Sequence, residues 1–182
     1  MSTFSPKALF IDRDGVLNDL VDRGDTFSFE GKPIRWTAPF HLHEVRLKPH
    51  AEEALKLIEA KGYLRIIVTN QPDVATGHID PEEFERMMDV FRALRVTEVR
   101  ACKHHPKDGC FCRKPRPGML LSVADFYNVD LFRSFMVGDM ETDIQAGKAA
   151  SVQTILVENP PDVPSGADHR FANILEVAKW LP

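Results

Sequence analysis

The chain has 182 residues, enough for one domain with a substantial core and too few for two full-sized domains. Its 23 Lys and Arg residues against 27 Asp and Glu residues give a net charge of −4, and no stretch gathers the cations that a dedicated nucleic-acid surface needs. No apolar run approaches membrane-spanning length, and residues 1–7 lack the layout of a signal peptide, so we expect neither nucleic acid nor a membrane as a partner.

Short apolar segments, each followed by polar residues, are predicted to be strands at residues 8–11, 64–68, 98–102, 135–137 and 154–157. Helices are predicted from apolar spacing and capping signals, beginning at Pro49 and Pro81 and covering residues 117–127, 141–150 and 171–180. Strands that alternate with helices imply a parallel sheet. We therefore predict an α/β fold, a Rossmann-like sheet with helices on both faces. No insertion is large enough for a separate cap domain, so residues 1–182 are expected to form a single domain.

A polar segment separates the first strand from the first helix, and we call its residues 19–46 the flap. Within it, residues 26–29 and 34–37 flank a Glu-Gly-Lys-Pro sequence and are predicted to form a small hairpin, although a proline weakens strand pairing. Trp36 and Phe40 are expected to anchor the flap or to line the entrance of a site. The flap is thus a candidate determinant of specificity.

Two carboxylates follow the first strand in the sequence Asp12-Arg13-Asp14-Gly15. One carboxylate can act as a nucleophile while the other transfers a proton, and both offer hard oxygen ligands for Mg²⁺. Gly15 permits a sharp turn of the backbone. Taken alone, the pair also fits a solvated turn.

Other predicted strand ends add matching groups. Thr69-Asn70-Gln71 offers a hydroxyl and two amides, which also fit a helix cap or turn. Lys114 follows Arg113 after the next strand, where a solvated cation pair is the alternative. Asp139 and Asp143 follow the fourth strand, and Asp143 also fits the exposed first turn of a helix. Ligands bind at the carboxyl ends of strands in open α/β sheets, and this combination suits phosphoryl transfer.

The chain resembles the haloacid dehalogenase-like phosphohydrolases over about residues 8–157. The resemblance rests on Asp12-Arg13-Asp14-Gly15-Val16-Leu17-Asn18, Thr69-Asn70-Gln71, Lys114, and Val137-Gly138-Asp139 with Asp143. It implies that Asp12 forms an aspartyl-phosphate, and that Asp14 protonates the leaving oxygen and then activates water. It implies phosphoryl binding by Thr69 and Lys114, and Mg²⁺ held by Asp12, the backbone carbonyl of Asp14 and Asp139, with Asp143 in support. Asn18, Asn70, Gln71 and Arg113 are expected to contact substrate.

Three cysteines and a histidine lie in one short segment, as Cys102, His104, Cys110 and Cys112. An odd number of clustered cysteines is a poor disulfide framework, whereas three thiolates and one imidazole complete a closed tetrahedral Zn²⁺ site. We predict a structural zinc in a loop over residues 102–112, with His105 as the competing imidazole. Reduced cysteines indicate a reducing compartment, so we expect a cytoplasmic protein.

This zinc loop narrows the resemblance to the heptose-bisphosphate 7-phosphatase branch, which shares a similar loop with histidinol-phosphate phosphatase domains. The chain departs from the heptose pattern in its longer flap, in Thr76, near which an arginine is usual, and in Met140, where lysine is frequent. The resemblance implies a phosphomonoesterase of a small phosphorylated metabolite such as a heptose bisphosphate, with Mg²⁺ for catalysis and Zn²⁺ for structure, and we expect a monomer. A histidinol-phosphate or other sugar-phosphate phosphatase and a catalytically silent, zinc-stabilised binding module are the alternatives.

Overall fold

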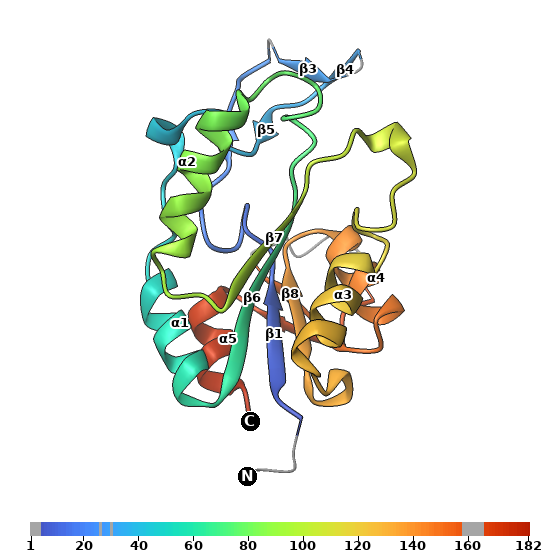
Figure 1. The fold of residues 1–182 in the computed structure, drawn as a ribbon. Coiled ribbons are helices and arrows are strands. Elements are labelled where there is room, and N and C mark those ends of the chain that lie inside the picture. The colour runs from blue at the N-terminus through green and yellow to red at the C-terminus, as the bar shows by residue number, and fades with distance from the viewer. Residues whose placement is uncertain (1–4, 26, 30, 158–165) are drawn as a thin grey trace.

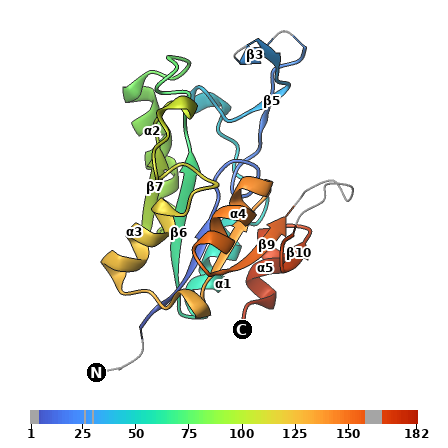
Figure 2. The ribbon, with the colours of Figure 1, turned by 90° about the vertical axis from the view of Figure 1, so that its right-hand side faces the viewer.

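The computed structural model describes residues 5–25, 27–29, 31–157 and 166–182. One six-stranded parallel sheet forms its centre, in the order β10-β9-β8-β1-β6-β7 (Figures 1 and 2). The strands are β1 (Lys7–Ile11), β6 (Tyr63–Asn70), β7 (Glu98–Cys102), β8 (Phe135–Gly138), β9 (Gln153–Val157) and β10 (His169–Phe171). The predicted α/β class with a parallel sheet is confirmed.

Helices cover both faces of this sheet, as Figure 1 shows. On one face lie α1 (Ala51–Ala60), α2 (Pro81–Arg92) and α5 (Ile174–Trp180), and on the other lie α3 (Gly118–Tyr127) and α4 (Glu141–Ala149). The alternation of side chains along β1 divides the core, because Leu9 and Ile11 pack with the first group of helices whereas Ala8 and Phe10 pack with α3. The sheet is therefore buried on both faces, which accounts for its continuous apolar strands.

Local signals set the ends of several helices. Asp80 accepts hydrogen bonds from the backbone N–H groups of Glu82 and Glu83, and Pro81 occupies the first position of α2. The apolar stripe of α2, which includes Phe84 and Phe91, is buried as its spacing predicted. The observed bounds otherwise differ from the predicted ones by one to a few residues.

The end of the chain and the flap differ from the sequence-based expectations. Residues 171–180 were expected to be one helix, but β10 occupies the start of this range and α5 begins only at Ile174. In the flap, β3 (Ser28–Phe29) pairs with β4 (Lys32–Pro33), whereas β5 (Trp36–Thr37) pairs with β2 (Val21–Asp22). The hairpin is therefore shorter than predicted, and Trp36 and Thr37, predicted as part of its second strand, pair with β2 instead. Positions 26 and 30 lie outside the described residues.

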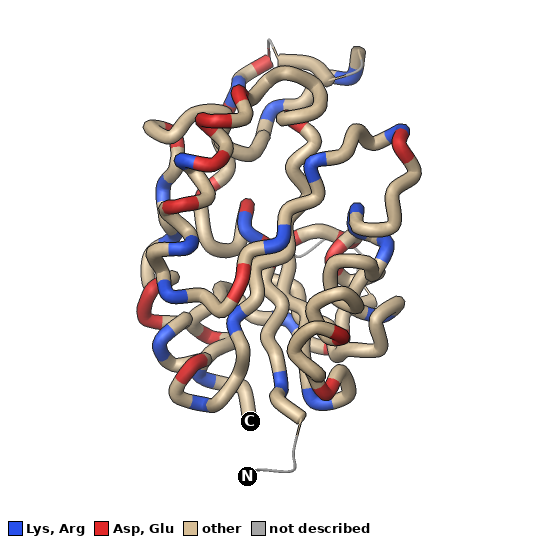
Figure 3. The backbone as a smooth tube through the Cα atoms, viewed as in Figure 1, with Lys and Arg blue, Asp and Glu red and all other residues tan. Residues whose placement is uncertain are grey.

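Cationic and anionic positions are interspersed along the chain in Figure 3. Among the residues that the structure describes, no helix has both the length and the apolar character that crossing a bilayer requires.

Candidate active site and zinc loop

The carboxyl ends of the central strands bring the predicted catalytic residues together. Asp12 follows β1, Thr69 lies near the end of β6, and Asp139 follows β8. Lys114 comes from the loop between β7 and α3, and its side chain reaches under this edge to donate to the Val68 carbonyl at 2.9 Å. Residues far apart in sequence thus meet because parallel neighbouring strands end on the same side of the sheet.

Lys114 is the centre of this cluster and is almost completely buried. Its Nζ lies 2.8 Å from Oδ1 of Asp12 and 2.6 Å from Oδ1 of Asp143. Burial alone lowers the pKa of Lys114, but the two carboxylates outweigh that effect and raise it above its usual value. The lysine therefore remains a cation inside the protein, held next to the Asp12 carboxylate.

Three carboxylates surround the ammonium and lie close enough to share one cation. Oxygens of Asp12, Asp139 and Asp143 lie within 4.8 Å of one another. Burial, followed by repulsion from Asp143, raises the pKa of Asp139 to about 7, and the same two causes raise the pKa of Asp12 well above its usual value. One lysine does not neutralise three carboxylates. The donor set therefore fits a divalent cation with a preference for oxygen, such as Mg²⁺.

Gly15 is required where the chain turns away from β1. Its φ is +81°, and a Cβ built on it would lie 2.1 Å from Oδ2 of Asp139. Any other residue would therefore displace a carboxylate of the candidate metal site, and would also strain the backbone.

Asp14 lies in a separate network of donors beside this cluster. Its carboxylate accepts hydrogen bonds from Asn18 Nδ2 at 3.0 Å and Gln71 Nε2 at 2.7 Å, and it forms an ion pair with Arg13. The Gln71 amide also donates to Thr69 Oγ1 at 2.9 Å. The hydroxyl expected to bind phosphate and the carboxylate expected to transfer protons therefore share one amide group.

Three residues that are expected to contact substrate form hydrogen bonds within the protein. Asn18 and Gln71 are fully buried, and their amides are used on Asp14 and its neighbours. Asn70 forms a reciprocal pair of 3.0 Å hydrogen bonds with the backbone of Lys114. Residue type predicted polar groups at this site, but not whether they face the ligand or another side chain. Arg13, to which sequence reasoning gave no role, is the largest of the fully buried side chains.

Arg113 has hydrogen-bonding capacity left for a ligand. Its buried Nη1 has no hydrogen-bond partner within the described part of the chain. Arg113 lines a cavity of about 220 Å³ together with Asp73 and aromatic residues of the flap, among them Trp36. A second cavity, of about 570 Å³, is lined by Trp36, Gly15 and Asp139. Trp36, which is 54% exposed, therefore lines both the cavity at the candidate metal site and the cavity at Arg113.

Phe40 attaches the flap to the rest of the molecule. Phe40 is only 8% exposed, stacks on the His78 ring at a centroid distance of 5.5 Å, and lies under the Arg23 guanidinium. Burial raises the pKa of Glu44, but hydrogen bonds from Arg23 and backbone N–H groups outweigh it and lower the pKa to about 2. Phe40 therefore anchors the flap through His78, Glu44 links Arg23 to the backbone at Phe40 within the flap, and Trp36 lines the cavities.

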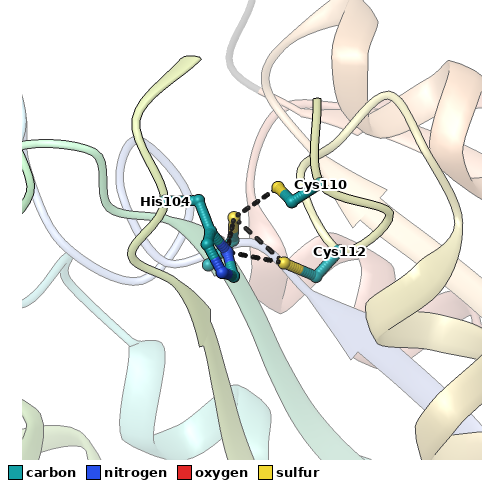
Figure 4. A group of neighbouring side chains, drawn as sticks. His104, Cys110 and Cys112 are labelled. Carbon is teal, nitrogen blue, oxygen red and sulfur yellow. Dashed lines mark hydrogen bonds between the residues drawn. The ribbon is translucent and has the colours of Figure 1, made fainter. Parts of the chain in front are cut away.

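The zinc loop brings four metal-binding atoms together (Figure 4). Cys102 Sγ lies 3.6 Å from Cys110 Sγ and 3.2 Å from Cys112 Sγ, and His104 Nδ1 lies 3.2 Å from Cys112 Sγ. Tetrahedral Zn²⁺ with bonds of about 2.3 Å to sulfur requires ligand atoms about 3.8 Å apart. The three cysteines form no disulfide. These residues therefore fit Zn²⁺, whereas the His105 ring accepts from the Lys107 backbone instead.

The zinc loop is packed tightly against the segment that carries Lys114. A Cβ on Gly118 would lie 2.4 Å from the Phe111 carbonyl oxygen, and Arg116 donates to the Cys110 carbonyl at 2.8 Å. The backbone of Lys114 is thus held between the loop on one side and Asn70 on the other. A metal in the loop would support the position of the catalytic lysine.

The two positions that depart from the heptose pattern supply no cation. The Thr76 hydroxyl lies 2.9 Å from His78 Nδ1, and Met140 is 56% exposed at the start of α4. Any second anionic group on a substrate must therefore be recognised by other residues.

Comparisons with known proteins identify the family to which the chain belongs. A family model of HAD-hydrolase-like proteins matches residues 111–170. D-glycero-beta-D-manno-heptose-1,7-bisphosphate 7-phosphatase of Helicobacter pylori is 30% identical over 184 residues, covering 96% of this chain and 97% of the relative. The enzyme of the same name from Pasteurella multocida is 32% identical over 192 residues, covering 97% and 95%.

A solved structure extends the agreement to three dimensions. The D,D-heptose 1,7-bisphosphate phosphatase of B. bronchiseptica, complexed with magnesium and phosphate, matches with a TM-score of 0.77 and 29% identity, covering 95% of this chain and 96% of that one. The chain therefore belongs to the HAD-like hydrolases, in the family of the D-glycero-beta-D-manno-heptose-1,7-bisphosphate 7-phosphatases, and is a phosphoric monoester hydrolase.

Proposed function

We propose that the chain is a Mg²⁺-dependent phosphomonoesterase that works through an aspartyl-phosphate on Asp12. The observation that carries this proposal is the buried ammonium of Lys114, held 2.8 Å from Asp12 within the cluster that also contains Asp139 and Asp143. A carboxylate nucleophile beside a fixed cation suits phosphoryl transfer, because charge on the transferred group must be neutralised.

The reaction proceeds in two displacements. The Asp12 carboxylate attacks phosphorus, the bond from phosphorus to the ester oxygen breaks, and Asp14 gives that oxygen a proton. Asp14 then accepts a proton from a water molecule, which attacks the aspartyl-phosphate, releases inorganic phosphate and regenerates the Asp12 carboxylate. The separation of the two carboxylates into different networks supports their different roles.

Lys114 and the Thr69 hydroxyl bind oxygens of the transferred phosphoryl group. Asp143 keeps Lys114 in place through the 2.6 Å contact, and its second oxygen accepts from the Met140 backbone at 3.1 Å. Asp143 therefore supports the site by holding Lys114 and the backbone at the start of α4. Arg113, with a donor left over, contacts the substrate.

Asp12, Asp139 and the backbone carbonyl of Asp14 would hold Mg²⁺. When bound, Mg²⁺ supplies positive charge that stabilises the phosphoryl oxygens and the attacking carboxylate. The raised pKa values of Asp12 and Asp139 support this assignment, because repulsion among buried carboxylates is what a cation would relieve.

Zn²⁺ in the loop of Cys102, His104, Cys110 and Cys112 has a structural role. Four protein ligands leave no position for substrate or water. Because Arg113 and Lys114 directly follow the last ligand, the metal fixes the backbone from which they extend. Reduced thiolates also support a cytoplasmic location.

The substrate proposed is D-glycero-beta-D-manno-heptose 1,7-bisphosphate, hydrolysed at its 7-phosphate by a monomeric enzyme. Near-full-length relatives of that name support it. Histidinol phosphate is the second candidate, because Thr76 and Met140 leave no cation where one is usual for the heptose pattern.

Phosphate release tests the proposal directly. Heptose 1,7-bisphosphate and histidinol phosphate are compared side by side, each with Mg²⁺ and with a chelator, using wild type and Asp12→Asn. We expect Mg²⁺-dependent turnover of the heptose, at least about 10⁴-fold weaker in Asp12→Asn. Activity that survives both treatments would overturn the mechanism, and preference for histidinol phosphate would overturn the substrate.

A further inference from the structure

Arg13 is a buried cation whose side chain turns back onto its neighbour in sequence. Its side chain is 1% exposed, and its shortest contact with the Asp14 carboxylate is 2.8 Å. Nε lies 3.1 Å from Oδ1 and 3.0 Å from Oδ2 of Asp14, and Nη2 lies 2.9 Å from Oδ1. The guanidinium therefore holds both carboxylate oxygens, and a planar fork fixes the orientation of a carboxylate in a way that a single donor does not.

The surroundings of Arg13 leave it little freedom to move. On the side of α2, Nη1 lies 3.7 Å from Met88 Sδ and the guanidinium carbon lies 5.3 Å from the centre of the Phe91 ring. Asp14 is the carboxylate that the described structure pairs with it. A buried cation in an apolar wall needs such a partner, so α2 and Arg13 together determine where the Asp14 carboxylate lies.

Gln71 extends this arrangement to the phosphate-binding side of the site. Its Oε1 accepts from Arg13 Nη2 at 2.9 Å, and its Nε2 donates to Asp14 Oδ2 at 2.7 Å and to Thr69 Oγ1 at 2.9 Å. Gln71 is fully buried, and its backbone N–H also donates to the Cys102 carbonyl at 2.7 Å. One amide thus sets Asp14 and Thr69 in register with each other.

We propose that Arg13 and Gln71 are positioning residues that aim the Asp14 carboxyl group at the leaving oxygen. The inference rests on the proposed role of Asp14 in proton transfer. The Asp14 side chain is 12% exposed, so it is not sealed off, while Arg13 and Gln71 fix the orientation of its carboxylate. Arg13 acts through Asp14, whereas Gln71 acts through Asp14 and also through the Thr69 hydroxyl.

If Arg13 and Gln71 position Asp14, replacing them should affect substrates with different leaving groups unequally, which a purely structural role would not do. Help from a proton donor matters most when the leaving oxygen is strongly basic, and little when the leaving group departs without a proton. A displaced Asp14 therefore slows hydrolysis of phenyl phosphate and of the heptose bisphosphate, whose leaving oxygens are basic, far more than that of p-nitrophenyl phosphate. Damage to phosphoryl binding, by contrast, slows all three.

The experiment compares kcat/KM for phenyl phosphate and p-nitrophenyl phosphate in the full-length, Mg²⁺-loaded enzyme, because kcat/KM includes the step in which the leaving group departs. The variants are Arg13→Lys and Gln71→Leu, with Asp14→Asn as reference. Arg65→Lys is the matched control, since Arg65 is another buried arginine with an ion pair, 2.6 Å to Glu59. Far-UV circular dichroism and thermal melts check folding.

We expect Asp14→Asn and Arg13→Lys to lower kcat/KM for phenyl phosphate by about 100-fold or more and that for p-nitrophenyl phosphate by less than about tenfold. Gln71→Leu also removes a donor to the Thr69 hydroxyl, so it should lower both values, and that for phenyl phosphate by at least about tenfold more. Arg65→Lys should leave the ratio of the two unchanged. If Asp14→Asn shows the difference and folded Arg13→Lys or Gln71→Leu does not, the positioning inference is wrong. If Asp14→Asn lowers both substrates equally, the proposed role of Asp14 fails instead. Should Arg13→Lys not fold, Gln71→Leu decides alone.

Discussion

Two clusters on either side of Lys114 differ in how the chain builds them. The carboxylates of Asp12, Asp139 and Asp143 come from the ends of two strands and from helix α4, and the sheet that places them is buried on both faces. The sulfur and nitrogen atoms of the zinc loop come from a single segment of eleven residues, from Cys102 to Cys112. The first cluster is therefore held by the fold, whereas we expect the second to depend on a bound metal.

This difference predicts which substitutions remove a reacting group and which only displace one. Disrupting the carboxylate cluster removes reacting or charge-bearing groups from an intact sheet. Disrupting the zinc loop leaves those groups in place and affects Lys114, which both regions share.

Replacing the shared residue should have the largest effect. Lys114→Met removes the cation that binds phosphoryl oxygens, and we expect kcat/KM to fall by at least about 10³-fold. It also leaves Asp12 and Asp143 unpaired, so the free energy of unfolding should fall by about 3 kcal/mol at pH 8. Because the pKa of Asp12 is raised, this carboxylate is protonated to a larger extent at pH 5, which weakens its repulsion with Asp143. The loss of unfolding free energy should therefore be smaller at pH 5 than at pH 8. Equal destabilisation at both pH values would show that the ion pairs are not its cause.

Loss of zinc should have an intermediate effect. We expect Cys110→Ser/Cys112→Ser to lose bound zinc and to lower kcat about 10- to 100-fold, the range for residues that orient a functional group. Circular dichroism of the sheet should change little, because Cys102, the loop cysteine that belongs to a buried apolar cluster, is unchanged and the two replaced cysteines only pack against that cluster. Full turnover of a metal-stripped protein would contradict the link between the loop and Lys114.

Much of the catalytic set was predictable, because each of its members lies next to a recognisable strand end. Asp12, Thr69 and Asp139 follow apolar runs of strand length, and parallel topology does the rest. The sequence also specified the zinc ligands, since they are close together along the chain. In both cases a local pattern was sufficient.

The parts that the sequence did not predict depend on how side chains pack. Nothing in Asp12-Arg13-Asp14 indicates that the arginine turns inward, nor does a Thr-Asn-Gln sequence tell that Gln71 faces Asp14 rather than substrate. The strand β10 has only three residues, and it is a strand because it pairs with β9, which its own sequence does not indicate. Pairing of β5 with β2 likewise depends on contacts across fourteen or more residues.

The carboxylate cluster should also respond to pH in a way that the zinc loop does not share. Because the pKa of Asp139 is about 7 in the folded protein and 3.8 in the reference state, the folded state binds the extra proton between these values. That contribution to stability is complete below about pH 4 and is lost as pH rises through 7. Without Mg²⁺ the melting temperature should therefore fall from pH 6 to pH 8. Since Mg²⁺ binds the ionised form, the rise that it causes should be several degrees larger at pH 8 than at pH 6. Asp139→Asn is the control, and an equal rise at both pH values would contradict the assignment.

The smallest effect is expected at the flap, where replacing Trp36 and replacing Phe40 should affect different properties. Trp36→Ala removes the half-exposed ring that joins the two cavities, and we expect KM for the heptose bisphosphate to rise about fivefold, equivalent to about 1 kcal/mol. Phe40→Ala removes a buried ring and should lower the free energy of unfolding by about 3 kcal/mol. If Trp36→Ala destabilises the protein and leaves KM unchanged, the ring is an anchor instead.

The most direct test of the account asks where the phosphoryl group is carried. Rapid acid quenching during turnover of ³²P-labelled substrate, followed by peptide mapping, identifies any phosphorylated residue. We expect label on the peptide containing Asp12, sensitive to hydroxylamine as an acyl phosphate is, and absent from Asp12→Asn. Label on a different residue, or steady turnover with no trapped label in enzyme slowed by Asp14→Asn, would contradict it.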